Sequence, residues 1–146
     1  MRVFICGIIQ GSISHLAVHE QSYRMRLRKM IEIYMPDCEV YCPVSIHPES
    51  LGYDEAKALE VFEESVEAAR QSRLLVAYLP EASMGSAIEM WEAKKAGVKV
   101  VTITALEHNW VVRLFSDIVV KTLDEFEELL KGSAIRRLIK QPGPGA

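Results

Sequence analysis

Short apolar runs alternate along this chain with longer segments in which apolar residues recur at helical spacing. We predict a strand for each apolar run: Val3–Ile9, Glu39–Val44, Leu74–Leu79, Lys99–Thr104 and Asp117–Lys121. We predict helices for the periodic segments, at about Ser14–Met35, Asp54–Gln71, Ser86–Ala96, Glu107–Phe115 and Leu123–Leu130, the last of them ending at Gly132. This order limits the chain to folds in which strands and helices alternate.

Three of the predicted strands, the first, third and fourth, are almost uninterrupted apolar runs. Such strands are typical of a parallel sheet that helices cover on both faces. With right-handed crossovers, the pattern favours an α/β fold with three layers: a doubly wound, parallel, five-stranded sheet in the flavodoxin-like order 2-1-3-4-5. At 146 residues and 49% hydrophobic content we expect one domain, residues 1–132, and a C-terminal tail, residues 133–146, that is partly disordered.

The strand order also predicts where a ligand binds. Sheets of this kind bind ligands at their carboxyl edge, where the winding direction reverses, which here lies between the first and third strands. Two loops meet at that point, Cys6–Ser12 ("CGIIQGS") and Pro80–Ala87 ("PEASMGSA"). Both are rich in glycine and small polar residues, which let a ligand approach the backbone closely.

Several ligand classes that this fold accepts leave sequence marks that are missing here. The chain has no P-loop motif, no Gly-x-Gly-x-x-Gly dinucleotide motif and no Gly-x-Ser-x-Gly nucleophile elbow. A phosphoacceptor domain needs an aspartate at the end of the third strand, where Leu79 and Pro80 stand. His15 and His19 lie four apart without a third ligand, so we interpret them as surface histidines. We therefore expect no cofactor and no metal.

Composition narrows the partners and the compartment. A net charge of −3 argues against nucleic-acid binding, and the basic cluster Tyr23–Met30 is interpreted as a solvated helix face. Cys6, Cys38 and Cys42 lack metal-ligand spacing and are expected to be reduced thiols. No signal peptide is recognised at the start of the chain, and no apolar run is long enough for a membrane span. We therefore expect a cytoplasmic protein that does not bind membranes.

Glu89, near the start of the fourth predicted helix, has two interpretations. The segment Ser86-Ala87-Ile88-Glu89 fits a capping box, in which Ser86 and Glu89 satisfy each other's backbone N–H groups. Alternatively, Glu89 faces the ligand cleft as an ionised carboxylate, which the positive end of the helix would favour. A carboxylate in such a place can attack the anomeric carbon of a sugar during glycosyl transfer.

Two segments of the sequence carry a resemblance to a known family. "VFICGIIQGS" (residues 3–12) and "PEASMGSAIEMWEAKKAGVKVVTI" (residues 80–103) resemble the nucleoside 2-deoxyribosyltransferase family, which includes nucleoside monophosphate N-glycosidases. The shared segment has the form Ser-x-Gly-x-x-x-Glu, here Ser83 to Glu89, followed by a helix and a strand at Lys99. The resemblance spans the whole predicted domain, although only the two loops are specific.

The resemblance implies roles for particular residues. Glu89 would be the catalytic nucleophile, which forms a covalent glycosyl intermediate as the base departs. The substrate, a nucleoside or nucleoside 5′-monophosphate, would contact Gly7, Gln10, Gly11, Ser12, Ser83, Gly85 and Asn109. The family also implies a homodimer or a higher homo-oligomer.

The chain departs from the family pattern at several positions. Ser65 stands where the family carries an aspartate that assists the leaving base, and Arg73 where an acidic residue often precedes the third strand. Glu64 and Glu81 are alternative candidates for the missing acid. Ile8, Gln10 and Phe4 replace a serine, an arginine and a tyrosine of the monophosphate glycosidases.

These departures leave more than one function open. The first is cleavage or exchange of the N-glycosidic bond of a nucleoside or nucleotide. The second is a non-catalytic nucleotide-binding or sensing domain, which the missing aspartate favours. The third is a partner-binding protein that would use Trp91 and Trp110, although both are expected to pack against neighbouring elements.

Overall fold

A computed structural model describes residues 1–141 and shows a five-stranded parallel sheet in the order β2-β1-β3-β4-β5. The strands are β1 (Arg2–Gly7), β2 (Glu39–Tyr41), β3 (Leu74–Tyr78), β4 (Lys99–Ile103) and β5 (Ile118–Val120). All four pairings are parallel. The predicted α/β fold of flavodoxin-like order is therefore confirmed, with β1 and β3 at the point where the winding reverses.

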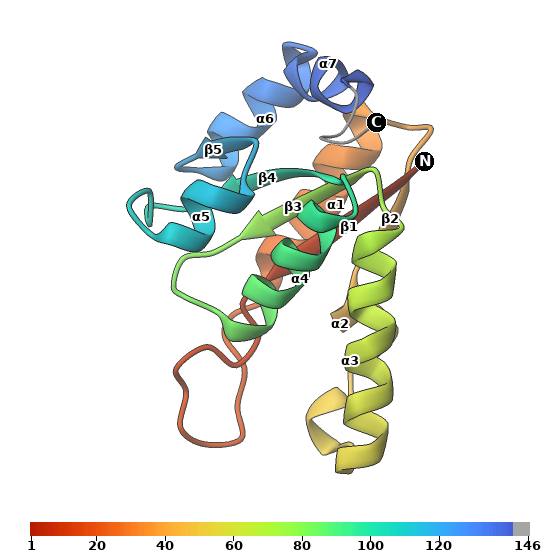
Figure 1. The fold of residues 1–146 in the computed structure, drawn as a ribbon, viewed down its shortest axis with the longest axis vertical. Helices are drawn as coiled ribbons and strands as arrows, with labels where there is room; N and C mark the ends of the chain where they lie inside the picture. The colour runs from red at the N-terminus through yellow and green to blue at the C-terminus, as the bar shows by residue number, and fades with distance from the viewer. Residues whose placement is uncertain (142–146) are drawn as a thin grey trace.

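Helices cover both faces of the sheet (Figure 1). On β1, Val3 and Ile5 face one core cluster, and Phe4 and Cys6 face the other, as the alternation of side chains along a strand requires. The first cluster packs against α1 (Ser22–Tyr34), α6 (Leu123–Lys131) and α7 (Ala134–Lys140). The second packs against α3 (Glu55–Arg70), α4 (Met84–Lys95) and α5 (Trp110–Phe115). A short helix, α2 (Pro43–Ile46), and a 3-10 turn, η1 (Ser50–Gly52), link β2 to α3.

The first helix begins later than the sequence pattern predicts. Residues 8–21 form a loop that extends away from the sheet (Figure 1), and α1 starts only at Ser22 rather than at Ser14. Gln21 closes the base of this loop, because its side-chain amide donates to the carbonyls of Ile8 and His19 at 3.1 and 2.8 Å. The backbone N–H of His19 also donates to Ile9 at 2.7 Å. These bonds replace the helix that apolar spacing alone suggested.

The C-terminal boundary also differs from the expectation. The segment from residue 133, expected to be a tail, contains α7, whose Ile135 and Leu138 are buried in the first core cluster. The domain therefore extends past residue 132 to at least Lys140. The expected disorder concerns mainly residues 142–146, which lie outside the described residues.

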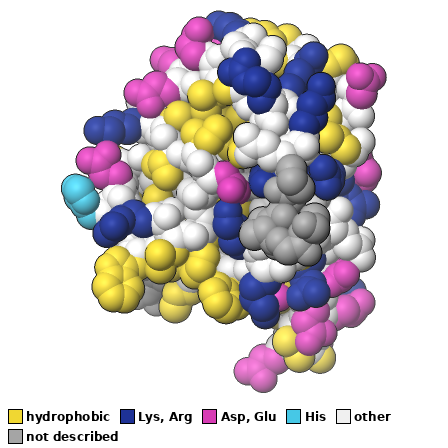
Figure 2. Space-filling model, turned by 45° about the horizontal axis from the view of Figure 1, so that its top comes forward, with side chains coloured by type: hydrophobic (Ala, Val, Ile, Leu, Met, Phe, Trp, Pro, Cys, Tyr) yellow, Lys and Arg dark blue, Asp and Glu magenta, His cyan; other side chains and the backbone are white. Residues whose placement is uncertain are grey.

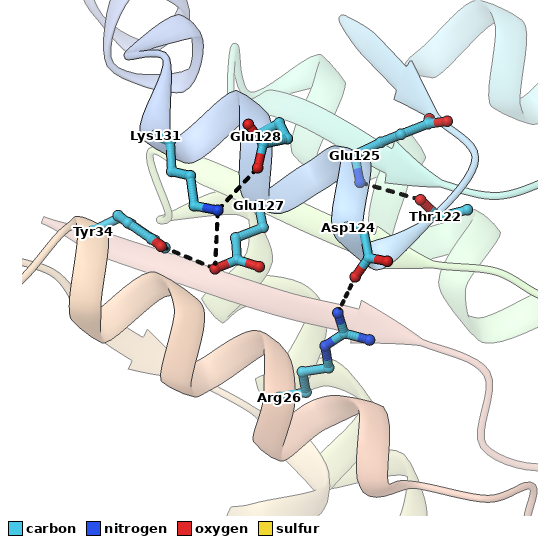
Figure 3. Close-up of polar contacts among 8 residues, drawn as sticks. All are labelled: Arg26, Tyr34, Thr122, Asp124, Glu125, Glu127, Glu128 and Lys131. Atoms are coloured by element: carbon cyan, nitrogen blue, oxygen red, sulfur yellow. Dashed lines mark hydrogen bonds and ion pairs between the residues drawn. The ribbon is translucent and has the colours of Figure 1, made fainter.

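Polar contacts join α6 to α1, which both cover the same face of the sheet (Figure 3). Arg26 on α1 pairs with Asp124 on α6. Further along the two helices, the Tyr34 hydroxyl donates to Glu127 at 2.9 Å, and Glu127 also lies 3.7 Å from the ammonium group of Lys131.

Within residues 1–141, no helix combines the length and hydropathy that a membrane span requires.

Candidate functional site

A cavity of about 310 Å³ opens at the carboxyl end of β1. Its walls come from the loop after β1, from the start of α4, from one side of α3 and from the irregular segment between β2 and α3. This is the edge of the sheet where the strand order predicts a ligand. The volume lies at the lower end of the range for small-molecule sites.

Glu89 lies in the second turn of α4, is half-buried and lines this cavity. The hydroxyl of Ser65 on α3 donates to its Oε1 at 2.7 Å, and the Cys6 thiol at the end of β1 also lies within hydrogen-bond reach. The cap of α4 is Ser83, whose Oγ accepts from the backbone N–H of Ser86 at 3.3 Å. The capping-box interpretation of Ser86 and Glu89 is therefore wrong, because the helix begins three residues earlier and Glu89 lies beyond its first turn.

Burial raises the pKa of Glu89 above its ordinary value. Hydrogen bonds from Cys6 and Ser65 and the positive charge of Arg24 lower it, but they do not cancel the effect of burial. Glu89 lies in the second turn of α4, whereas the field of the helix dipole acts mainly within the first.

A buried arginine on α1 supports the strand end that forms the cavity floor. Arg24 Nη2 donates to the carbonyl of Gly7 at 2.9 Å, and its Nε donates to Gln21 Oε1 at 2.6 Å. Its relative exposure is 5%. The interpretation of Tyr23–Met30 as a solvated face is therefore wrong at Arg24, although Arg26 and Lys29 are exposed as expected.

The structure divides the predicted binding residues between two neighbouring cavities. Gly7, Gln10, Gly11, Ser83 and Gly85 line the same cavity as Glu89. The other two, Ser12 and Asn109, line a second cavity of about 400 Å³, which shares Gly11, Ser83 and Met84 with the first.

Asn109 also has a structural task. It is the N-cap of α5, and its Oδ1 accepts from the backbone N–H of Val111 at 2.9 Å. Its side-chain oxygen is thus already engaged by the helix that follows it.

Two glycines of the first loop are required by its shape. A Cβ at Gly7 would lie 2.4 Å from the Tyr23 hydroxyl oxygen and 3.0 Å from the backbone oxygen of Tyr78. Gly11 has a φ of 54°, in the left-handed region that favours glycine, and a Cβ there would lie 2.6 Å from Ile8 and from His19. Both glycines line the same cavity as Glu89, so the loop meets the cavity with backbone rather than with a side chain at these two positions.

The candidates for the missing acid lie elsewhere. Glu64 faces His47, with 3.5 Å between Oε2 and Nε2, and accepts from the Tyr41 hydroxyl at 3.4 Å. Glu81 is exposed and faces His19 at 3.7 Å. Neither glutamate lines either cavity. A search of residues 1–141 finds no group of three histidine, cysteine, aspartate or glutamate side chains that could hold a metal.

Several cavity residues were not identified from the sequence. His47 and Tyr53 come from the irregular segment between β2 and α3, which carries no periodic signal. Ala58, Val61 and Phe62 line the cavity from α3, beside Ser65, which the family resemblance had already singled out. These α3 residues follow the i, i+3, i+4, i+7 spacing of one side of a helix. Periodicity therefore indicates this side of α3, but it cannot distinguish a side that lines a ligand cavity from one that packs in the core.

We expect Glu89→Gln to melt at or above the temperature of the wild type at pH 8. Burial raises the pKa of Glu89, so in the folded protein its carboxyl group stays protonated at pH values somewhat above the ordinary carboxyl pKa of about 4.3. At a pH above this raised pKa the group ionises, and the buried charge lowers the stability of the folded state. Glutamine carries no charge, so its advantage should shrink as the pH falls from the raised pKa toward the ordinary one. Thermal melts of both proteins from pH 8 to pH 4 measure this. A variant that melts well below wild type at pH 8 would contradict the prediction.

No model of a known protein family matches this chain, and no significant match is found among curated proteins. Solved structures do match. A 2-deoxyribosyltransferase from the psychrotolerant bacterium Bacillus psychrosaccharolyticus aligns over 87% of this chain and 90% of its own, with a TM-score of 0.66 and 12% identity. A conserved protein from Enterococcus faecalis V583 aligns over 90% and 98%, with a TM-score of 0.61 and 20% identity. The chain shares their fold. At these identities the likeness does not extend to individual residues.

Proposed function

We propose that this protein is an enzyme that cleaves or exchanges the N-glycosidic bond of a nucleoside, with Glu89 as the nucleophile. The observation that carries the proposal is the position of the Glu89 carboxylate. It lies on the wall of a cavity of about 310 Å³, and its Oε1 accepts from Ser65 rather than from the start of its own helix. The shared fold with a 2-deoxyribosyltransferase supports this chemistry.

The proposed reaction has two steps. A Glu89 oxygen attacks the anomeric carbon, the bond from that carbon to the base breaks, and the bonding electrons leave with the base, which takes up a proton. The resulting glycosyl ester is then attacked by water in a hydrolase or by a second base in a transferase, and the carboxylate is released. Ser65 holds the carboxylate in place during the first step.

The lining of the cavity favours an unphosphorylated nucleoside over a nucleoside 5′-monophosphate. Among residues 1–141, no lysine or arginine lines it, and Gln10 offers only a neutral amide. Ser83, Gly85 and the loop from Gly7 to Ser12 offer hydroxyl and backbone groups suited to sugar hydroxyls. Leu51, Val61 and Phe62 form an apolar part that suits the face of a base.

We further propose that the enzyme acts as a homodimer in the cytoplasm. Figure 2 shows hydrophobic side chains gathered toward the lower left of one face. On α4, Met84, Ile88 and Trp91 are exposed, and Trp110 on α5 is 76% exposed. Apolar surface of this kind commonly marks a protein interface. The cysteines are all free thiols, in keeping with a reducing compartment.

The test is an assay of base release. Wild-type protein is incubated with ribo- and deoxyribonucleosides and with their 5′-monophosphates, and the free base is separated by chromatography. We expect release from at least one nucleoside and slower release from its monophosphate. Acid quenching followed by mass spectrometry should show protein whose mass has increased by one glycosyl group. Absence of release from every compound would refute the enzyme.

A non-catalytic nucleotide-binding domain is the alternative, and one observation favours it. Ser65, at the position of the family aspartate, places a neutral hydroxyl rather than a carboxylic acid beside Glu89. Under this alternative a nucleoside or nucleotide would raise the melting temperature without release of base by any form of the protein.

A further inference from the structure

Three side chains form a line that ends at the cavity. Glu64 Oε2 on α3 lies 3.5 Å from His47 Nε2, and His47 Nδ1 lies 3.4 Å from the Tyr53 hydroxyl. The far end is fixed as well, because the Tyr41 hydroxyl on β2 donates to the other oxygen of Glu64 at 3.4 Å. The His47 and Tyr53 rings meet edge to face, with centroids 6.1 Å apart.

The inner end of this line belongs to the cavity that holds Glu89. His47 and Tyr53 both line the cavity, whereas Glu64 stands behind them. Glu89, His47 and Tyr53 are the titratable side chains that line it among the described residues. The His47 side chain is only 17% exposed, and among the described residues its buried Nε2 makes no hydrogen bond. The Glu64 carboxylate, 3.5 Å away, is its charged neighbour.

A departing base needs a proton, and the cavity offers few sources for one. Ser65 already donates its hydroxyl proton to Glu89 at 2.7 Å, and Glu89 must be ionised to attack. A histidine gives up or takes a proton near neutral pH, which makes it the usual general acid in enzymes. His47, held between a carboxylate and a hydroxyl, is placed for that task.

We propose that Glu64, His47 and Tyr53 form a proton relay that protonates the departing base. The proposal rests on the proposed glycosyl transfer. As the bond from the anomeric carbon to the base breaks, a ring nitrogen of the base takes the Tyr53 hydroxyl proton. The Tyr53 oxygen takes the Nδ1 proton of the His47 imidazolium, which becomes neutral. The Glu64 carboxylate, 3.5 Å from Nε2, stabilises the positive charge of the imidazolium before that transfer. Solvent later returns one proton to Nδ1.

The relay is tested with two substrates that differ in their need for a proton. Guanine departs from 2′-deoxyguanosine or guanosine with protonation, whereas the 7-methyl derivatives already carry a positive charge on the base and release it as a neutral molecule. Spontaneous release is subtracted. We expect His47→Gln and Tyr53→Phe to slow release from the unmethylated nucleoside by about 10²-fold or more, the usual contribution of a general acid. Release from the methylated nucleoside should be little changed.

Control variants separate the relay from the proposed function. His108→Gln changes an exposed histidine outside both cavities and should alter neither rate. Glu89→Gln should abolish both rates, because the nucleophile is needed whatever the leaving group. Tyr53→Phe removes a single oxygen atom and keeps the test valid if His47→Gln does not fold.

The outcomes are distinguishable. Equal loss on both substrates, or no loss on either, in His47→Gln and Tyr53→Phe overturns the relay while the proposed function stands. No release by wild type from any nucleoside overturns both.

Discussion

Replacing Glu89 by glutamine is expected to reduce base release by at least on the order of 10³-fold, since removal of a covalent nucleophile in other enzymes costs up to about 10⁶-fold. Glutamine keeps the shape of the side chain and can still accept from Ser65, so the cavity should be preserved. What it loses is the anionic oxygen that bonds to the anomeric carbon. The glycosylated protein should also disappear from the mass spectrum.

The effect should appear in the rate rather than in the affinity. A nucleoside should still raise the melting temperature of Glu89→Gln, because the loop glycines and the apolar wall that surround it are unchanged. Glu81→Gln is the matched control, because Glu81 is exposed and lines neither cavity. If Glu89→Gln releases base at the wild-type rate, Glu89 is not the nucleophile.

The pH dependence follows from the same carboxyl group. Burial raises the pKa of Glu89, so the fraction in the reactive, ionised form is lost at a higher pH than for an exposed glutamate. Once a nucleoside fills the cavity and excludes water, Ser65, Cys6 and Arg24 remain as the groups that favour ionisation. Burial therefore makes ionised Glu89 costly for the fold, and the same burial places its carboxylate on the wall of a cavity where a substrate can bind.

The strand order was predictable because each central strand is an apolar run of its own. That order also located the ligand edge, and it brought the loop after β1 and the start of α4 together around Glu89. Helix limits were less predictable. Residues 14–21 have helical apolar spacing, but the Gln21 amide closes a loop there through contacts to Ile8 and His19 that no local pattern encodes.

The part of the site that the sequence did not reveal comes from long-range contacts. His47 and Tyr53 lie in a segment without periodicity and reach the cavity only because α3 folds back beside them. The departure at Ser65 was visible in the sequence, but its hydrogen bond to Glu89 required the packing of α3 on α4. Arg24 lay in a basic cluster, and periodicity alone cannot tell which member of such a cluster turns inward.

Arg24→Met is expected to lower the free energy of unfolding by roughly 2–3 kcal/mol, because it leaves the buried carbonyl of Gly7 without its charged donor. The methionine side chain fills much of the space of the arginine stem, so the loss reports hydrogen bonds rather than a cavity. Urea unfolding of both proteins, followed by circular dichroism, gives the difference. Arg28→Met is the matched control on the same helix. The Arg28 side chain is 36% exposed and faces Glu32 at 3.5 Å, so we expect a change within about 0.5 kcal/mol.

The same substitution should affect Glu89 through charge. Arg24 is a positive group whose field lowers the pKa of Glu89, so its removal should raise that pKa further and move the loss of base release at low pH toward neutral pH. Arg28→Met should leave the profile in place. If Arg24→Met unfolds at the same urea concentration as wild type, Arg24 is not an anchor of the strand end. If its stability falls but the profile does not move, Arg24 supports β1 without tuning the nucleophile.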